Sequence, residues 1–141
     1  MSAQLEVIAS DIDAPEQELD IMQQLMRCRK WIEDALAYSG LEETHTFTDI
    51  CKGVLNGNLH LWHGDNGCAV TEFVVYPMSK CLHVFLAGGD MQQILDFEES
   101  ATVWGKAQGC TQMTIAGRKG WSKVLGNRGW TEVHTVMGRE I

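Results

Sequence analysis

Residues 109–130 carry the most restrictive pattern in the chain, because the period of their apolar residues changes from that of a strand to that of a helix. Polar and apolar side chains alternate over residues 111–116, which predicts a strand. Trp121, Val124 and Leu125 follow at the i, i+3, i+4 spacing of one helix face. Glycines lie at the turns on both sides of this helix. The segment therefore predicts a strand followed by a short helix that packs back onto the same sheet.

The composition is that of a folded protein of ordinary size. Of the 141 residues, 45% are apolar and 21% are charged, which predicts a single domain over residues 1–141. The net charge of -8 argues against general binding to nucleic acid or to anionic membranes. No apolar run approaches the ~20 residues of a membrane span, so we expect a soluble protein that does not bind membranes. The five cysteines include no CxxC pair, and we expect them to be reduced and mostly buried.

The first third of the chain predicts a short strand followed by two helices. Residues 5–8 are an apolar run typical of a strand. Asp13, Pro15 and Glu16 then form a helix start, because side-chain oxygens can satisfy free N–H groups and proline has none to lose. Apolar residues keep one helical face for several turns. A second helix is expected over residues 46–56, with a threonine as its N-terminal cap.

The middle of the chain predicts three consecutive antiparallel strands. They cover residues 58–63, 68–76 and 81–86, and tight turns join them. Residues 81–86 are almost entirely apolar, as in a central strand that is covered on both faces.

The remaining elements complete an α/β order. Residues 87–90 break the third strand, a helix follows over residues 91–109, and residues 131–139 predict a last strand. The full order is β-α-α-β-β-β-α-β-α-β, which predicts a mixed, mostly antiparallel sheet with helices on both faces.

This order, together with the segment GCTQMTIAGRKGWSKVLGNRGW, resembles the GNAT superfamily of acyl-CoA N-acyltransferases. Gly129-Trp130 stands where that family usually has Gly-Phe at the end of its last helix. The amino-acid sequence of this segment looks most like those of the short GNAT-like proteins of tailed bacteriophages. The resemblance implies acetyl-CoA as cofactor, transfer to an amine of a protein or small molecule, and a place in the host-cell cytoplasm or the virion. A phage or host protein is then the implied partner.

In the GNAT family the cofactor pyrophosphate rests on the N-terminus of the helix after the fourth strand, where unpaired N–H groups attract an anion. This resemblance places the cofactor at residues 86–92 and near Arg118. The usual phosphate-binding signature is absent, and Asp90 would place a negative charge at the helix start. In the alternative reading, the paired glycines form a tight turn and Asp90 is an ordinary N-cap. The residues assigned to the cofactor are Leu86, Ala87, Gly88, Gly89, Met91, Gln92 and Arg118.

The catalytic residues are less clearly marked. The resemblance places the usual tyrosine acid at Leu125, which cannot act as an acid. His83 and Glu72 are titratable residues on the predicted central strands, so both are candidate general bases. The alternatives are a structural histidine and a solvated glutamate. His60 and His63 fall on opposite faces of one strand, and no metal site is expected.

A basic cluster accompanies the last helix. It places four cations in eleven positions, which indicates either an anion site or a solvated helix face. Its members are Arg118, Lys119, Lys123 and Arg128. Two hypotheses remain open at this point. The protein is either an acyl-CoA-dependent N-acyltransferase or a catalytically silent GNAT-fold accessory or virion protein that acts through protein contacts.

Overall fold

The computed structural model describes residues 14–39, 44–116 and 120–141. The opening strand expected at residues 5–8 lies outside these ranges. None of the described helices is long and apolar enough to cross a membrane. In chain order, the elements are α1 (Ala14–Ser39), α2 (Phe47–Leu55), β1 (His60–His63), β2 (Gly67–Tyr76), β3 (Ser79–Gly89), α3 (Met91–Asp96), α4 (Glu98–Ala107), β4 (Gln112–Ile115), α5 (Gly120–Leu125) and a 3-10 turn at Gly126–Arg128.

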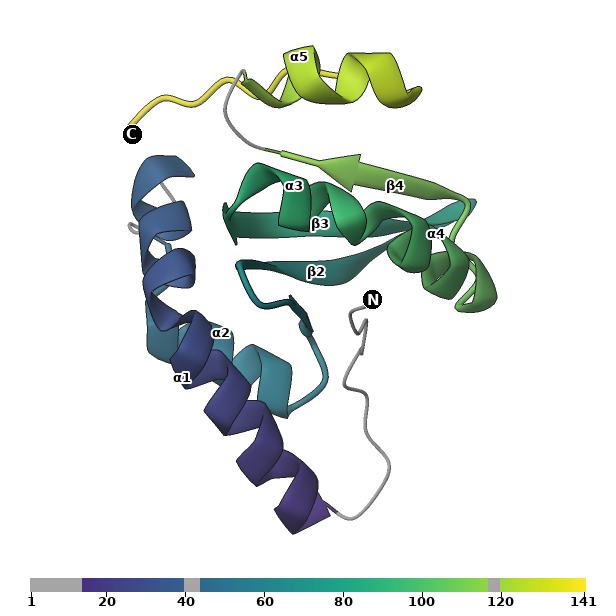
Figure 1. The fold of residues 1–141 in the computed structure, drawn as a ribbon. Coiled ribbons are helices and arrows are strands. Elements are labelled where there is room, and N and C mark those ends of the chain that lie inside the picture. Colours follow the sequence, from purple (N-terminus) through teal and green to yellow (C-terminus); the bar gives the residue numbers. More distant parts are fainter. Residues whose placement is uncertain (1–13, 40–43, 117–119) are drawn as a thin grey trace.

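The sheet has the order β1-β2-β3-β4 (Figure 1). Strands β1, β2 and β3 form the predicted antiparallel meander, and β4 joins the edge of β3 in parallel. The parallel pairing is possible because α3 and α4 carry the chain back across the sheet between β3 and β4. The predicted α/β class with a mixed sheet is therefore confirmed.

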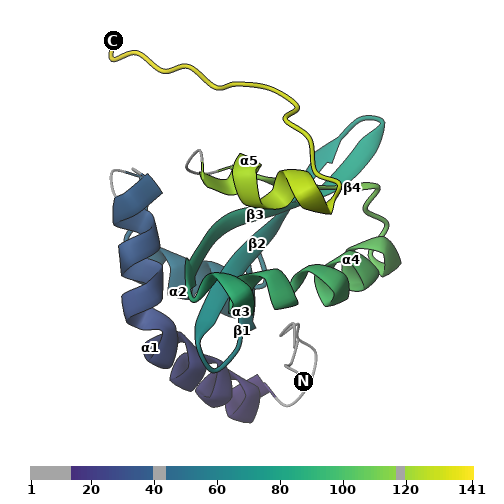
Figure 2. The ribbon, with the colours of Figure 1, turned by 45° about the horizontal axis from the view of Figure 1, so that its top comes forward.

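Helices cover both faces of this sheet (Figures 1 and 2), and the buried side chains form one core on each face. The first core joins α1 and α2 to the sheet, and its fully buried members include Leu25, Ile32 and Ile50. The second core lies under α3 and α4, around Trp62 and Leu82. The central strand β3 contributes to both cores, as its apolar sequence predicts.

The helix starts confirm the predicted capping. Thr46 precedes α2 and forms a capping box with Asp49, in which each side-chain oxygen accepts a hydrogen bond from the other residue's backbone N–H. Asp90 precedes α3, and its carboxylate accepts a hydrogen bond from the backbone N–H of Gln93 at 3.1 Å. Both caps satisfy donors that would otherwise be left open at the helix ends.

Two predicted elements differ in the structure. The single helix expected over residues 91–109 is interrupted at Phe97, which is 4% exposed and ends α3 while it begins α4. The Phe97 ring belongs to the second core, and a helical pattern of apolar residues alone does not encode the interruption at this position. The third strand also runs past its predicted end and includes Gly88 and Gly89.

The last predicted strand was wrong. Residues 131–141 are exposed and form no ladder in the structure (Figure 2). The alternating pattern identifies a segment that could have one apolar face, but a strand also needs a neighbour that accepts its backbone hydrogen bonds.

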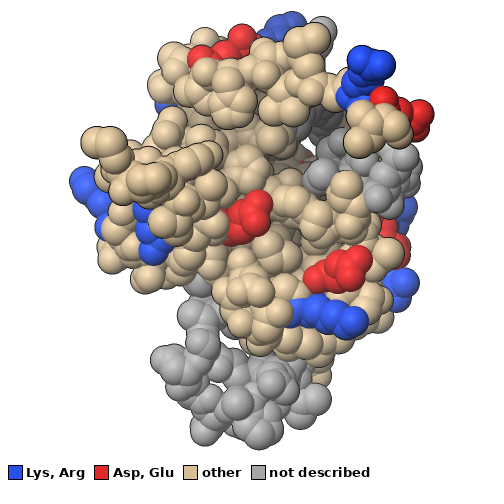
Figure 3. Space-filling view, turned by 180° about the vertical axis from the view of Figure 1, so that it is seen from behind, with Lys and Arg blue, Asp and Glu red and all other residues tan. Residues whose placement is uncertain are grey.

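Charged groups are dispersed over the face seen from behind. Lys and Arg side chains are scattered around this face among uncharged residues and do not gather into one patch (Figure 3).

Candidate active site

Strands β3 and β4 separate after a short parallel stretch. Their pairing runs from Cys81↔Gln112 to Val84↔Ile115, where β4 ends, while β3 continues along β2 to Gly89. A β-bulge lies at the point of separation: Val84 and Leu86 have partners on β2 and Phe85 has none. A bulge bends its strand and strengthens the local twist. The result is a fork at the carboxyl ends of two parallel strands, where open α/β sheets commonly bind ligands.

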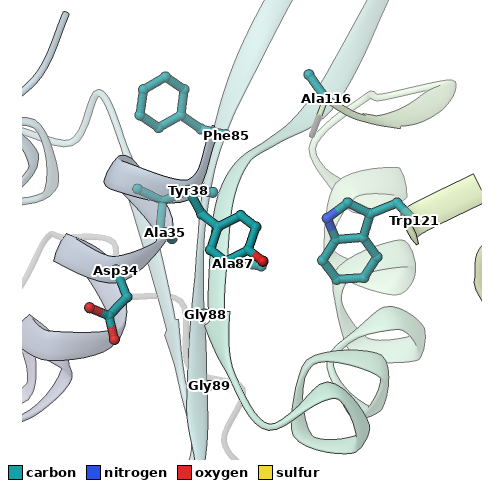
Figure 4. Close-up of a pocket in the computed structure, with 10 residues that line it drawn as sticks. Asp34, Ala35, Tyr38, Phe85, Ala87, Gly88, Gly89, Ala116 and Trp121 are labelled. Carbon is teal, nitrogen blue, oxygen red and sulfur yellow. The ribbon is translucent and has the colours of Figure 1, made fainter. Parts of the chain in front are cut away.

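A pocket of about 110 Å³ occupies this fork. Its floor is the end of β3, and its sides come from the last turns of α1, the end of β4 and the first turn of α5. Figure 4 shows Tyr38 and Trp121 facing one another across the pocket, with Ala87 and Gly88 on the strand between them. The lining residues are Asp34, Ala35, Tyr38, Phe85, Leu86, Ala87, Gly88, Gly89, Ala116 and Trp121.

The structure brings together four of the seven predicted cofactor residues, Leu86 to Gly89, in the wall of this pocket. Met91 and Gln92 begin α3 and are not among the lining residues. Arg118 lies outside the described residues.

Both glycines have packing reasons to be glycine. Gly89 has a φ of 100°, and a Cβ there would lie 2.5 Å from the carbonyl oxygen of Asn66. A Cβ on Gly88 would collide with the carbonyl oxygen of Trp31 on α1. The backbone N–H of Asp90 then donates to Asn66 at 2.8 Å, which fixes the turn into α3. Both glycines are therefore the last residues of β3, paired with Cys68 and Gly67 of β2, and the tight turn into α3 follows them at Asp90. Asp90 is the N-cap that the alternative reading of the sequence predicts.

The fork and the start of α3 differ in how well they fit acyl-CoA. The fork holds a pocket of about 110 Å³ that is lined by both backbone and aromatic groups, which suits the thioester end of such a molecule. The start of α3 suits the phosphates less well, because the carboxylate of Asp90 already caps it and repels an anion.

His83 and Glu72 lie directly opposite one another on β3 and β2. Paired residues of antiparallel strands project from the same face, so their side chains are neighbours. His83 Nδ1 lies 2.8 Å from Thr114 Oγ1 on β4. Burial lowers the pKa of His83, the Glu72 carboxylate opposes this change, and His134 of the C-terminal segment adds to it. Neither candidate base lines the pocket, and their catalytic role remains a prediction.

Helix α5 lies beside β4, and of the three residues predicted to pack onto the sheet only Leu125 is buried (Figure 1). Trp121 and Leu125 border a second cavity of about 50 Å³, together with Met113 and Ile115 of β4. Leu125, which holds the position of the usual tyrosine acid, is 6% exposed and contributes to packing alone.

Only part of the basic cluster can be placed. Arg128 Nε donates to Glu98 Oε1 at 2.6 Å, and Trp130 Nε1 donates to the other carboxylate oxygen at 2.7 Å. Lys123 is exposed on α5, and Lys119 lies outside the described residues. Arg128 therefore serves to hold the end of the last helical segment to α4.

His60 of β1 is a buried, hydrogen-bonded histidine. His60 is 5% exposed, and its Nδ1 lies 2.9 Å from Thr71 Oγ1. Burial, with a smaller effect from Lys80, lowers the pKa of His60 to about 4.

Across the described ranges, no three His, Cys, Asp or Glu side chains come together as a metal site. The five cysteines are free thiols, and four of them are buried.

The sequence reasoning missed the contribution of α1 to the pocket. Asp34 and Tyr38 are one turn apart, and they lie off the buried stripe that contains Ile32 and Leu36. That i, i+4 spacing of a carboxylate and a phenol was a readable signal. The spacing does not predict the opposite side of the pocket, because Trp121, which forms that side, is far away in the sequence.

Comparison with known proteins gives similarity at the level of structure. No protein-family model matches the sequence, and no curated protein is similar enough to count as a match. The aminoglycoside N-acetyltransferase AAC(6')-Iy in complex with CoA has a TM-score of 0.63 at 13% identity, covering 85% of this chain and 90% of that enzyme.

Two further solved structures extend this similarity. A Clostridium acetobutylicum protein described as a predicted acetyltransferase, with acetyl-CoA, has a TM-score of 0.57 at 12% identity over 87% of this chain and 91% of its own. A GNAT family acetyltransferase of Staphylococcus aureus has a TM-score of 0.55 at 11% identity, with both chains covered completely. The forked mixed sheet and its flanking helices are thus the fold of the GNAT-family acetyltransferases.

Proposed function

We propose that this protein is an N-acyltransferase that takes an acyl group from acyl-CoA and transfers it to an amine. The fork between β3 and β4, with its pocket at the carboxyl ends of both strands, is the observation that carries this proposal. CoA or acetyl-CoA is bound in two of the similar structures, which supports the choice of acyl donor.

The chemistry requires few groups. The amine nitrogen attacks the thioester carbonyl carbon, the C–S bond breaks, a base takes the proton of the amine, and the CoA sulfur leaves as a thiolate that becomes protonated. We assign the base to His83, because its lowered pKa keeps the imidazole neutral near pH 7. Since His83 does not line the pocket, it takes the proton through a bridging water. When Nδ1 donates to Thr114, the Nε2 lone pair is left to accept a proton.

The pocket also favours an amine as acceptor. Asp34 and Tyr38 provide oxygen atoms on its α1 side, and the chain as a whole carries a net charge of -8. An acidic protein attracts cationic amines by long-range electrostatics. We therefore expect a polyamine, an aminoglycoside-like amine or a lysine side chain to be acetylated before any neutral alcohol.

A direct test is calorimetric titration with acetyl-CoA. Ala116 is exposed and lines the pocket, so Ala116→Trp should fill the fork and lower the affinity at least tenfold while the fold survives. Ala107→Trp, at an exposed position of α4 away from the pocket, is the matched control and should bind as the wild type does. Equal affinity in both variants would remove the fork as the binding site.

The second hypothesis is a catalytically silent accessory or virion protein of a tailed phage. The Asp90 cap and the apolar Leu125 favour it, since both occupy positions where a typical enzyme of this fold has functional groups. Absence of acetyl-CoA binding at millimolar concentration would support this hypothesis over the enzyme.

A further inference from the structure

Trp121 contributes to the lining of two cavities. One is the pocket of the fork, and the other is the cavity of about 50 Å³ between the sheet and the helices α3, α4 and α5, which we call the apolar chamber.

The apolar chamber begins where the fork begins. Val84 and Ile115 form the last pair between β3 and β4, and both line the chamber. The next residue on each strand, Phe85 and Ala116, lines the fork pocket instead. The two cavities are therefore adjacent along the strands, and Trp121 lines both.

The walls of the chamber are built for an apolar occupant. They consist mainly of aliphatic and aromatic side chains, and the polar lining groups belong to Thr71 and Glu98. Thr71 Oγ1 is already bonded to His60 and Trp62, at 2.9 Å in each case. Both carboxylate oxygens of Glu98 accept hydrogen bonds from the last helical segment. A polar occupant would lose its hydrogen bonds to water and gain few in return, whereas an alkyl group loses none.

We propose that the apolar chamber receives the alkyl chain of an acyl thioester longer than acetyl, and that the volume of the chamber limits the chain length. This inference rests on the proposed function, because it assumes that the thioester end of acyl-CoA lies in the fork. It assigns a substrate class, short- to medium-chain acyl-CoA, that neither the fold nor the similar structures specify.

The size of the chamber sets the expected length. A volume of about 50 Å³ has room for roughly three or four groups of the size of a water molecule or a methylene. Butanoyl and hexanoyl chains match this capacity, whereas an acetyl group would leave the chamber unused. Each fully buried methylene strengthens binding by roughly fourfold. Hexanoyl-CoA should therefore bind about tenfold more tightly than acetyl-CoA, even if only part of its chain is buried.

Calorimetric titration of the full chain with CoA, acetyl-CoA, hexanoyl-CoA and dodecanoyl-CoA tests this inference without requiring activity. The expected affinities rise from CoA to hexanoyl-CoA and stop rising at dodecanoyl-CoA. If all four bind with the same affinity, the chamber proposal is overturned while acyl-CoA binding stands. If none of them binds, the proposed function itself fails and the chamber proposal fails with it.

Two variants locate the effect. Ala101 is 5% exposed and lines the chamber, so Ala101→Leu should reduce the ratio of hexanoyl-CoA to acetyl-CoA affinity to near one. Ala107→Leu, on an exposed position of the same helix, should keep the wild-type ratio. Should Ala101→Leu fail to fold, Leu95→Ala enlarges the same wall and should shift the preference towards octanoyl-CoA. An unchanged chain-length preference in the folded variants would overturn the assignment.

Discussion

Thr71 is the centre of a buried polar network, and its replacement by valine should destabilise the fold far more than its size suggests. The side chain is 2% exposed, and its hydroxyl is 2.9 Å from both His60 Nδ1 and Trp62 Nε1. The indole N–H can only donate, so the hydroxyl oxygen accepts from it. Valine preserves the shape and removes the partner of two buried polar groups.

The magnitude follows from those two groups. An unsatisfied buried donor or acceptor costs about 1 to 3 kcal/mol, so with two such groups Thr71→Val should lower the free energy of unfolding by about 2 to 6 kcal/mol. Thr71→Ser is the matched control, because it keeps the hydroxyl and loses one buried methyl group, at a cost of about 1 kcal/mol.

Urea unfolding followed by tryptophan fluorescence gives both values, provided that the slope of the free energy against urea is the same for the two variants. The indole N–H resonance of Trp62 should also move in Thr71→Val and stay in place in Thr71→Ser. If the valine variant is as stable as the serine variant, then the hydroxyl is not the structural centre of this network, and the reasoning fails.

Three other outcomes are expected. Because burial lowers the pKa of His60 from 6.5 to about 4, the unfolded chain binds more protons at this residue between these values. The contribution of His60 to stability should therefore be constant above pH 7 and fall by about 3 kcal/mol as the pH drops to 4, and His60→Gln should remove this part of the pH dependence in urea titrations. Glu98→Ala removes the hydrogen-bond acceptor of Arg128 and Trp130 and should lower the free energy of unfolding by about 1 to 2 kcal/mol. Proteolysis after α5 should become faster, and an unchanged rate of proteolysis would contradict the anchoring role of Glu98. If His83 is the base, His83→Ala should lower kcat by ~100-fold or more at nearly constant KM for acyl-CoA. Because the neutral imidazole acts as the base and its pKa is lowered, the wild-type rate should stay constant as the pH is lowered to 6.5 and fall only below that value. A rate that already falls before the pH has been lowered to 6.5 would exclude His83 as the base.

Local signals were sufficient to predict most of the elements. The Thr46 capping box and the turns between β1, β2 and β3 depend on residues close together in the sequence, and the structure contains all of them. The turn into α3 was also readable, because Gly89 has a positive φ and Asp90 caps the helix, although β3 continues through both glycines before that turn.

The site was less predictable, because its parts meet only in the folded sheet. The unpaired Phe85 that marks the fork has no signature in an apolar run, since a bulge changes register without changing composition. Tyr38 and Trp121 face one another only because β4 pairs with β3. The 131–139 segment illustrates the converse, since its pattern is that of a strand and the structure provides no neighbour for it.

The parallel pairing of β4 with β3 also determines how the protein should fold. Tyr76 and Ser79 meet across a turn of the meander, whereas His83 and Thr114 are 31 residues apart when their strands pair. Closing the longer loop costs more chain entropy, so we expect the meander to form early and β4 to dock late. The fork is then among the first places to open in the native state, and its amide hydrogens should exchange faster than those of β2. A molecule that bridges both arms of the fork would slow that exchange, so ligand binding here would act as a clamp on the last step of folding.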